Sequence, residues 1–510
     1  MKFSTFKKST IRILLILVIL GLSSMAWVEY QLRKVRGTYV ELVDSNQFIK
    51  PQSKLLVKNV AVLSEDGTIM IDSQNVFINQ GRIEKITKEL SSTADYAVID
   101  GSGKYLIPGL VDSHVHLRNS KNDLLLYLAN GVTYVREMSG NKTHIQWRKE
   151  KKETIVGPRL FITSEKVYND GGLKGMFTSW TRTRINLDDP NKAIDLAKRL
   201  KDEGYDGIKI SNFLNREMYT ALAQASSDEG IPLVGHIPND ISLTDFWDYN
   251  QQEIAHIEEL TKALNREFGG YTSTNSGEFI QYVQRRSHGI AKKLIEHDIA
   301  VTSSIWLMES LPEQKFNLKA ALKLVPLEYV NPASLEGTPL TKGWLPGHNS
   351  YELNAETINN RDAKRRSQIF WDTYVSAIRI MTRTLAQYNV KILAGTDAET
   401  PITVPGFSLH DELVSLNNSG LSTAQTLQTA TSLPGVWMQT NTGKIAKGYD
   451  ADLVLLNKNP LENIANTKSI ASVIHEGRHI NRATLDQMLQ EVKNHNNNER
   501  TQSIDEFLNE

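Results

Sequence analysis

A pair of histidines separated by a single residue is the first sign of chemistry in this chain. His114 and His116 follow an apolar run, 106–111, that is typical of a β-strand. On a strand, residues i and i+2 project to the same face, so both imidazoles can approach one ion. With 12 histidines in 510 residues, chance alone gives roughly 0.3 such pairs, so the context of the pair has to decide whether it binds a metal.

Four other polar side chains occupy the ends or interiors of further apolar runs. They are His236 after 231–234, His256 within 253–257, Asp397 after 390–393 and Lys209 within 207–210. Each has an ordinary structural explanation, such as a hydrogen-bonded core histidine, a buried ion pair for Lys209 or a helix N-cap for Asp397. If all of those explanations held, unrelated residues would have come by chance to lie in successive strands. A shared site is the simpler explanation.

A regular series of elements carries these six side chains. Eight apolar runs of strand length alternate with helix-length spacers: 106–111, 132–135, 159–163, 207–210, 231–234, 253–257, 300–305 and 390–393. The alternation predicts an α/β fold with a (β/α)8 TIM barrel over residues 104–439. Because active sites of such barrels lie at the carboxyl ends of the strands, the six side chains would converge there.

Short strand-like runs with turn signals flank the predicted barrel on both sides, in 53–103 and 440–480. They include 443–445, 452–456 and 472–474 in the second segment. We expect the two segments to pair into one small β-sandwich domain.

Two further segments depart from the barrel pattern. Residues 305–365 are rich in Pro, Gly, Asn and Trp and are too long for an ordinary loop, which predicts either a cover over the site or a folded surface excursion. The C-terminal tail, 482–510, is polar. Leu485, Met488, Leu489 and Val492 have helical spacing within it, which predicts a surface helix.

Composition excludes several kinds of site. The chain has 58 Lys and Arg against 58 Asp and Glu, so no basic surface for nucleic acid is indicated. It has no cysteine, which rules out disulfides, thiolate metal sites and cysteine nucleophiles. Any metal must therefore be held by nitrogen and oxygen ligands. We expect a small-molecule substrate, and a homo-oligomer is left open.

The N-terminus, residues 1–30, reads as a signal peptide or a membrane anchor. Basic residues that include Lys7, Lys8 and Arg12 precede an apolar run, and Ser24-Met25-Ala26 resembles a cleavage site only weakly. Left uncleaved, the run is just long enough to span a bilayer, roughly 18 residues. We therefore expect an exported protein, periplasmic or otherwise extracytoplasmic, with a slight preference for an anchor retained in the inner membrane.

At this point the sequence resembles the amidohydrolase superfamily, and within it the imidazolonepropionase-like and Xaa-Pro dipeptidase-like group. The matching segments cover about residues 53–480: Leu106-Ile-Pro-Gly-Leu-Val-Asp-Ser-His-Val-His-Leu117, Gly131–Arg136, Gly207-Ile-Lys-Ile-Ser211, Val234-Gly-His236, Ile254-Ala-His-Ile-Glu258, Leu393-Ala-Gly-Thr-Asp397, Pro405-Gly406, Ala430-Thr431 and Gly448–Leu453. The segment 305–365 and the tail depart from the family pattern.

The resemblance implies a binuclear metal site. His114, His116 and Asp397 would bind the buried ion, and His236 and His256 the more exposed one. Lys209 would bridge both as a carbamate formed with CO2, which also removes the cost of a buried ammonium. The two divalent ions would best be Zn²⁺, with Mn²⁺ and Co²⁺ left open. Imidazolonepropionases bind one metal and lack a bridging lysine, so Lys209 favours the dipeptidase-like branch.

The resemblance also implies a mechanism, in which a hydroxide bridging the metals attacks a carbonyl and Asp397 carries a proton to the leaving nitrogen. The expected substrate is a dipeptide (Xaa-Pro-like) or an N-acyl amino acid. Lactones, carbamates and phosphoesters stay open on the same site, as does a non-catalytic barrel. Candidate substrate contacts are Tyr134, Arg136 and His410, with a structural ion pair favoured for Arg136, and the insert aromatics Trp306, Trp344, His348 and Tyr351.

Overall fold

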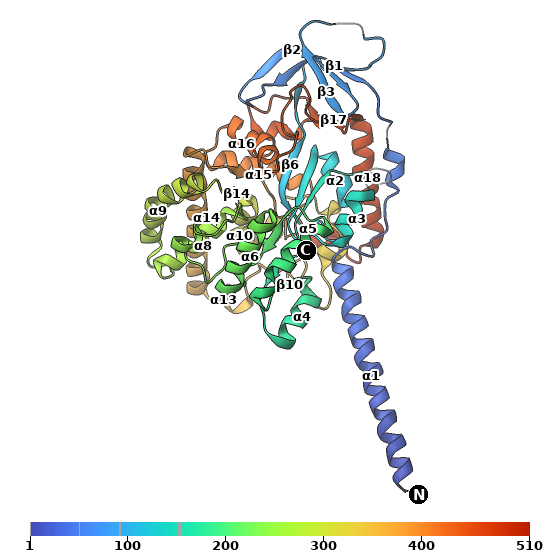
Figure 1. Cartoon of the computed structure of the whole chain (residues 1–510), viewed down its shortest axis with the longest axis vertical. Coiled ribbons are helices and arrows are strands. Elements are labelled where there is room, and N and C mark those ends of the chain that lie inside the picture. Colours follow the sequence, from blue (N-terminus) through green and yellow to red (C-terminus); the bar gives the residue numbers. More distant parts are fainter. Residues whose placement is uncertain (1, 50, 91–92, 151–155, 510) are drawn as a thin grey trace.

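Eight short parallel strands form the centre of the molecule. The computed structural model describes residues 2–49, 51–90, 93–150 and 156–509 (Figure 1). The barrel strands are β6 (Leu110–Val115), β7 (Val132–Glu137), β8 (Arg159–Ile162), β11 (Ile208–Ile210), β12 (Leu233–Gly235), β13 (Glu253–Ile254), β14 (Ala300–Thr302) and β15 (Ile392–Leu393). Parallel bridges Thr163–Gly207 and Val115–Ala398 join the β6–β8 sheet to the β11–β15 sheet at both edges. The predicted (β/α)8 barrel is confirmed.

The first predicted barrel strand was misplaced. The apolar run that starts at Leu106 contains two strands, because β5 (Tyr105–Pro108) pairs with strands of the small sheet and β6 of the barrel begins only at Leu110. Gly109 separates them at a close approach, where an added Cβ would lie 2.0 Å from the Thr133 hydroxyl. Both strands are almost fully buried, so hydropathy alone does not reveal the boundary.

Helices connect the barrel strands and cover them from outside (Figure 1). They are α2 (Asp123–Ala129), α3 (Lys142–Glu150), α5 (Ala193–Glu203), α6 (Arg216–Glu229), α7 (Leu243–Phe246), α8 (Ile257–Phe268), α9 (Ser276–Glu296), α14 (Arg361–Gln387), α15 (Phe407–Asn418), α16 (Thr423–Thr429) and α17 (Ser432–Trp437). Their ends follow local sequence signals. The Asn215 side chain accepts from the Met218 amide at the start of α6, and Gly230 ends that helix in the left-handed conformation.

The flanking segments form one eight-stranded sheet at the end of the molecule opposite the N-terminus (Figure 1). Its strands are β1 (Leu55–Leu63), β2 (Met70–Asn79), β3 (Arg82–Thr87), β4 (Ala97–Asp100), β5, β16 (Leu453–Leu456), β17 (Ile470–His475) and β18 (Arg478–Asn481). The N- and C-terminal parts meet where β5 pairs antiparallel with β16, and side chains from both parts share one apolar core. Residues 443–445 form no strand, contrary to the prediction, and Gly443 adopts a positive φ of 82°.

The 305–365 segment folds as helices with a core of its own. It contains α10 (Ile305–Phe316), α11 (Leu318–Leu322), α12 (Pro332–Glu336), α13 (Ala355–Asn359) and the start of α14. Its apolar side chains pack on Ile402 and Val404, which follow barrel strand β15. The tail forms α18 (Arg482–Glu499) and α19 (Ile504–Asn509), and α18 buries Leu485, Met488 and Val492, as their spacing predicted.

The N-terminal residues form one long helix, α1 (Lys2–Val35), that extends away from the barrel (Figure 1). Within it, Thr10–Val35 is long and apolar enough to cross a membrane, with a mean hydropathy of 2.3 over its most apolar window. A second projecting element, α4 (Gly172–Arg182), stands between β9 (Val167–Tyr168) and β10 (Ile185–Asn186) in the connection after β8.

Candidate metal centre

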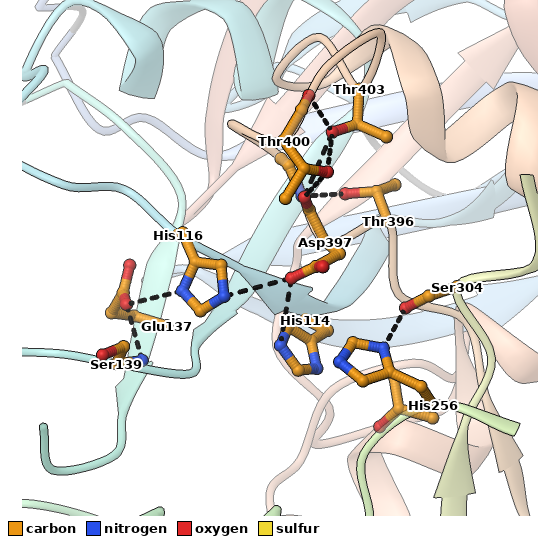
Figure 2. Close-up of polar contacts among 12 residues, drawn as sticks. His114, His116, Glu137, Ser139, His256, Ser304, Thr396, Asp397, Thr400 and Thr403 are labelled. Atoms are coloured by element: carbon orange, nitrogen blue, oxygen red, sulfur yellow. Dashed lines mark hydrogen bonds and ion pairs between the residues drawn. The ribbon is translucent and has the colours of Figure 1, made fainter. Parts of the chain in front are cut away.

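Three of the predicted ligands lie in direct contact at the carboxyl ends of the first and last barrel strands. The Asp397 Oδ1 atom is 3.0 Å from His116 Nε2 and 3.4 Å from His114 Nε2 (Figure 2). One potential ligand atom from each of the three residues lies within 4.8 Å of the others. His114 is the last strand residue but one, and His116 follows the strand directly.

Backbone contacts between β6 and the residues after β15 create this arrangement. The Asp397 amide donates to the His114 carbonyl at 2.8 Å. The buried Asp112 carboxylate accepts from the Thr396 amide and hydroxyl at 3.0 and 2.7 Å. At Gly395 an added Cβ would lie only 2.7 Å from the His114 Cβ. The segment after β15 can therefore approach β6 this closely only because residue 395 is glycine.

His256 and His236 extend the cluster around the barrel. The His256 ring centroid is 4.4 Å from that of His114 and 5.4 Å from that of His236. Ser304, after β14, lies 2.9 Å from His256 Nδ1 (Figure 2). The buried Glu259 carboxylate lies 3.4 Å from His236 Nδ1. Each of these partners leaves the other ring nitrogen available for a ligand.

Lys209 is fully buried on β11, in register with Val234 on the strand that leads to His236. An added Cβ at Gly235, the residue before His236, would lie 3.1 Å from the Lys209 Cδ. The Lys209 Nζ has no hydrogen-bond partner among the described residues. Burial, with the Lys166 cation as the next cause, lowers the pKa of Lys209 to about 7. The charge on Lys209 in turn contributes to the lowered pKa values of His114, His236 and His256.

The charge states of the cluster suit a cation. Burial lowers the pKa of His236 to about 4 and those of His114 and His256 well below the usual value, so these imidazoles are neutral. Burial opposes ionisation of Asp397, but the His116 hydrogen bond and the Lys166 cation help to outweigh it, and the pKa of Asp397 stays well below its ordinary value. Neutral imidazoles beside a carboxylate are the donor set of a divalent metal site.

Buried polar atoms without hydrogen-bond partners also indicate a cation site. Both His114 ring nitrogens and the Lys209 Nζ are buried without a hydrogen-bond partner in the described chain. Buried polar groups left unpaired are costly, and metal coordination would remove that cost here. The residues present therefore fit a metal centre.

The other sequence candidates lie elsewhere. Arg136 is fully buried and paired with Glu253 at 2.9 Å, the structural role favoured for it. His410 is held by Thr467 and the Asn130 carbonyl at 2.9 and 3.1 Å, and Tyr134 on β7 is in register with Arg159 at the start of β8, so neither belongs to the cluster.

Of the aromatic residues singled out in the insert, Tyr351 is linked electrostatically to the cluster. Burial raises the pKa of the Tyr351 phenol, and the negative charges of Asp397 and Glu258 add to the shift. Trp344 lies in the core of the insert, and His348 contacts the Thr341 carbonyl at 2.9 Å.

Sequence reasoning missed the residues that support the histidines. Glu137 lies 3.8 Å from His116 Nδ1 and accepts from the Ser139 amide at 2.8 Å (Figure 2). Ser304 and Glu259 hold the other two rings, as described above. Glu259 stands three residues after His256 in sequence, a spacing that carries no signal because its partner is His236 on the preceding strand.

Comparison with known proteins first identifies the class to which the fold belongs. The structure aligns with a bottromycin amidohydrolase at a TM-score of 0.66 with 18% identity, covering 92% of this chain and 96% of the other. It aligns with a putative prolidase from Bifidobacterium longum at 0.58 with 19% identity, covering 87% and 100%. These likenesses show a shared fold, a barrel with a small sheet domain.

The family follows from the sequence. The model of the Amidohydrolase family matches residues 105–480, and the chain belongs to that family. It is 29% identical over 164 residues to an imidazolonepropionase from Thermoplasma volcanium (31% of this chain, 38% of the relative). It is 36% identical over 204 residues to a dihydroorotase from Anoxybacillus flavithermus (36% and 42%). The matches thus span about two-fifths of these relatives.

Proposed function

We propose that this protein hydrolyses an amide C–N bond of a small substrate, either a dipeptide of the Xaa-Pro kind or an N-acyl amino acid. The observation that carries the proposal is the convergence of His114, His116 and Asp397 on one point beside three further predicted ligands. The named hydrolases among its relatives and structural neighbours, which include a Xaa-Pro dipeptidase, support this bond type.

Two divalent ions, Zn²⁺ by preference, would occupy the cluster. His114, His116 and Asp397 would hold one, and His236 and His256 the other. Lys209 would bridge them as a carbamate, in which the neutral amine adds to CO2 and releases a proton. A lysine that is buried, unpaired and of lowered pKa is suited to that reaction, because only the neutral amine attacks CO2.

Bound ions would supply Lewis acidity toward a substrate carbonyl and a lowered pKa for water. The chain itself supplies the proton carrier. Asp397 is held ionised by its surroundings and lies at the centre of the cluster, so its carboxylate can accept a proton from attacking water and pass it to the leaving nitrogen. Tyr351 would contact the substrate from the side of the insert, since the charge on Asp397 contributes to the raised pKa of its phenol.

The test combines metal analysis with a substrate panel. Full-length protein in detergent, wild type and Lys209→Ala, is assayed for metal by plasma mass spectrometry and for amine release from dipeptides and N-acyl amino acids. We expect about two ions in the wild type and fewer in the variant, with turnover of the amides. Turnover restricted to esters, lactones or carbamates would contradict the amide assignment, and a metal-free protein under metal-replete conditions would contradict the centre itself.

We also propose that α1 is retained as an anchor that holds an exported barrel at the membrane. The candidate span Thr10–Val35 contains the uncharged run 13–28, slightly longer than the 7–15 residues or so of a signal-peptide core. The end of α1 is built into the fold, with Leu32 and Val35 buried and the Val35 carbonyl accepting from the Ser334 hydroxyl at 3.2 Å. Intact mass of the protein extracted from membranes tests this, and a mature chain starting near Trp27 would refute it.

A further inference from the structure

The helix α4 exposes an apolar face that nothing in the described chain covers. Leu173, Met176 and Phe177 are 83, 70 and 62% exposed. Their spacing of i, i+3 and i+4 places them on one side of the helix. Scattered apolar residues are common on protein surfaces, but three large ones on one face mark an interaction site.

The opposite side of α4 is fixed to the barrel. Gly175 is the buried residue of the helix, and its carbonyl accepts from the Tyr168 hydroxyl at 2.6 Å. An added Cβ at Gly175 would lie 2.6 Å from the Asp170 carbonyl oxygen, so α4 packs closely against the segment that precedes it. The apolar face is therefore held outward by the packing beneath it.

Two hydrogen bonds connect the C-terminal end of α4 to the end of α1. The Trp180 indole donates to Glu29 at 2.8 Å, and Arg36 donates to the Thr181 carbonyl at 2.9 Å. A helical span needs about 20 residues, so a span that starts at Thr10 reaches the membrane surface near Glu29. Trp180 would then lie at the level of the headgroups, where tryptophan is enriched in membrane proteins.

The direction of α4 agrees with this placement. Figure 1 shows α4 projecting from the end of the barrel from which α1 departs, away from the small sheet. Arg182 and Arg184 follow at the C-terminal end of the helix and supply positive charge for anionic lipid headgroups.

We propose that α4 is a second membrane contact, which lies in the bilayer interface with Leu173, Met176 and Phe177 among the acyl chains. The inference goes beyond amide hydrolysis and rests on the anchoring by α1 proposed above. The connection that carries α4 follows β8 at the carboxyl end of the barrel. Arg118, two residues after His116, contacts the Val35 carbonyl at 3.4 Å. Together α1 and α4 would turn the mouth of the site toward the lipid surface.

The natural absence of cysteine allows a direct test with single labels. Full-length Phe177→Cys carries an environment-sensitive fluorophore in vesicles of phosphatidylcholine with one quarter phosphatidylglycerol. Leu17→Cys, in the apolar part of α1, reports the anchor, and Lys292→Cys, exposed on α9, reports the aqueous side. Lipids brominated near the headgroup or near the chain end act as quenchers of known depth.

We expect the label at position 177 to emit at shorter wavelength and to be quenched most by bromine near the headgroup. The label at 17 should respond most to the chain-end bromine and the label at 292 to neither. Adding Leu173→Ser and Met176→Ser to the Phe177→Cys protein removes most of the apolar face while leaving the base of α4 intact, so quenching at 177 should fall, with an unchanged circular dichroism spectrum.

Three outcomes would overturn the proposal. Quenching at 17 without quenching at 177 would refute the role of α4 and leave the anchor standing. A label at 177 that is shielded but not quenched by lipid would show that protein, such as a second copy of this chain, covers the face. Quenching at neither position would refute both the anchor and the second contact.

Discussion

The two halves of the candidate metal centre are held in different ways. In the first half, the Asp397 carboxylate lies 3.0 Å from His116 Nε2 and 3.4 Å from His114 Nε2, and backbone hydrogen bonds between β6 and the residues after β15 set these positions. In the second half, the ring centroids of His236 and His256 are 5.4 Å apart, much like those of His114 and His116 at 5.3 Å, but the separate side chains Glu259 and Ser304 orient the two rings.

This difference predicts which substitutions should abolish activity or metal binding and which should only weaken the binding of one ion. The first half depends mainly on the ligands themselves, because the backbone already places them and the supporting Glu137 carboxylate lies 3.8 Å from His116 Nδ1. The second half depends on supporting side chains, which can be removed without removing a ligand. Loss of a supporting partner typically costs about 10–100-fold in metal affinity or activity. The comparison can therefore be tested by graded substitutions.

The largest effect is expected for Asp397→Asn, because this residue is assigned both to the first half and to proton transfer. Turnover should fall by about 10³-fold, the order of magnitude of a lost general base. The measurement is kcat on the best substrate of the amide panel, with metal content in parallel to separate binding from chemistry. The control is Asp411→Asn, an outer carboxylate paired with Lys468. Full turnover in Asp397→Asn would contradict the role in proton transfer assigned to Asp397.

Much of the first half, and of the barrel that carries it, could be predicted from the sequence. The spacing of His114 and His116 and the polar residues after apolar runs are local signals, and the order of the strands brings them together. The boundary at Gly109 could not be predicted, because buried strands on either side share one hydropathy pattern. Glu259 and Ser304 were missed because each supports a histidine on a neighbouring strand, which is a contact that only the closed barrel creates.

The second prediction concerns Lys209, the residue proposed to bridge the two halves. Lys209→Met should bind less metal, and its activity should fall by at least about 100-fold. That is the upper end of the loss that follows removal of a supporting side chain. Carbamate formation needs the neutral amine, and burial lowers the pKa of Lys209 to about 7. In metal-free protein incubated with ¹³C-bicarbonate, a carbamate resonance should therefore grow as pH rises through 7. Its persistence in Lys209→Met would show that the signal comes from another amine.

A smaller effect is expected for Glu259→Gln, which weakens the second half without touching a ligand. The substitution replaces the Glu259 carboxylate beside His236 with a neutral amide. The His236 ring is then less firmly oriented and less basic. We expect a loss of about 10–100-fold in affinity for the more weakly held ion, measured by chelator competition. Glu267→Gln on the same helix α8, where the carboxylate pairs with Arg286 at the surface, is the matched control. Equal losses of both ions would contradict the division into two halves.

The smallest effect is expected for Ser304→Ala, which removes one neutral hydrogen bond from His256 Nδ1. One such bond contributes about 1 kcal/mol, or roughly a fivefold change in affinity for the same ion. The change is small because the turn that carries Ser304 is held independently: the buried Glu412 carboxylate accepts from the Ile305 amide at 2.9 Å and the Trp306 amide at 2.7 Å. Ser310→Ala, which deletes a comparable hydroxyl contact to the Leu307 carbonyl on α10, should leave both ions unchanged. A loss in Ser304→Ala as large as that in Glu259→Gln would mean that the two supports act as one unit, because His256 and His236 would then move together.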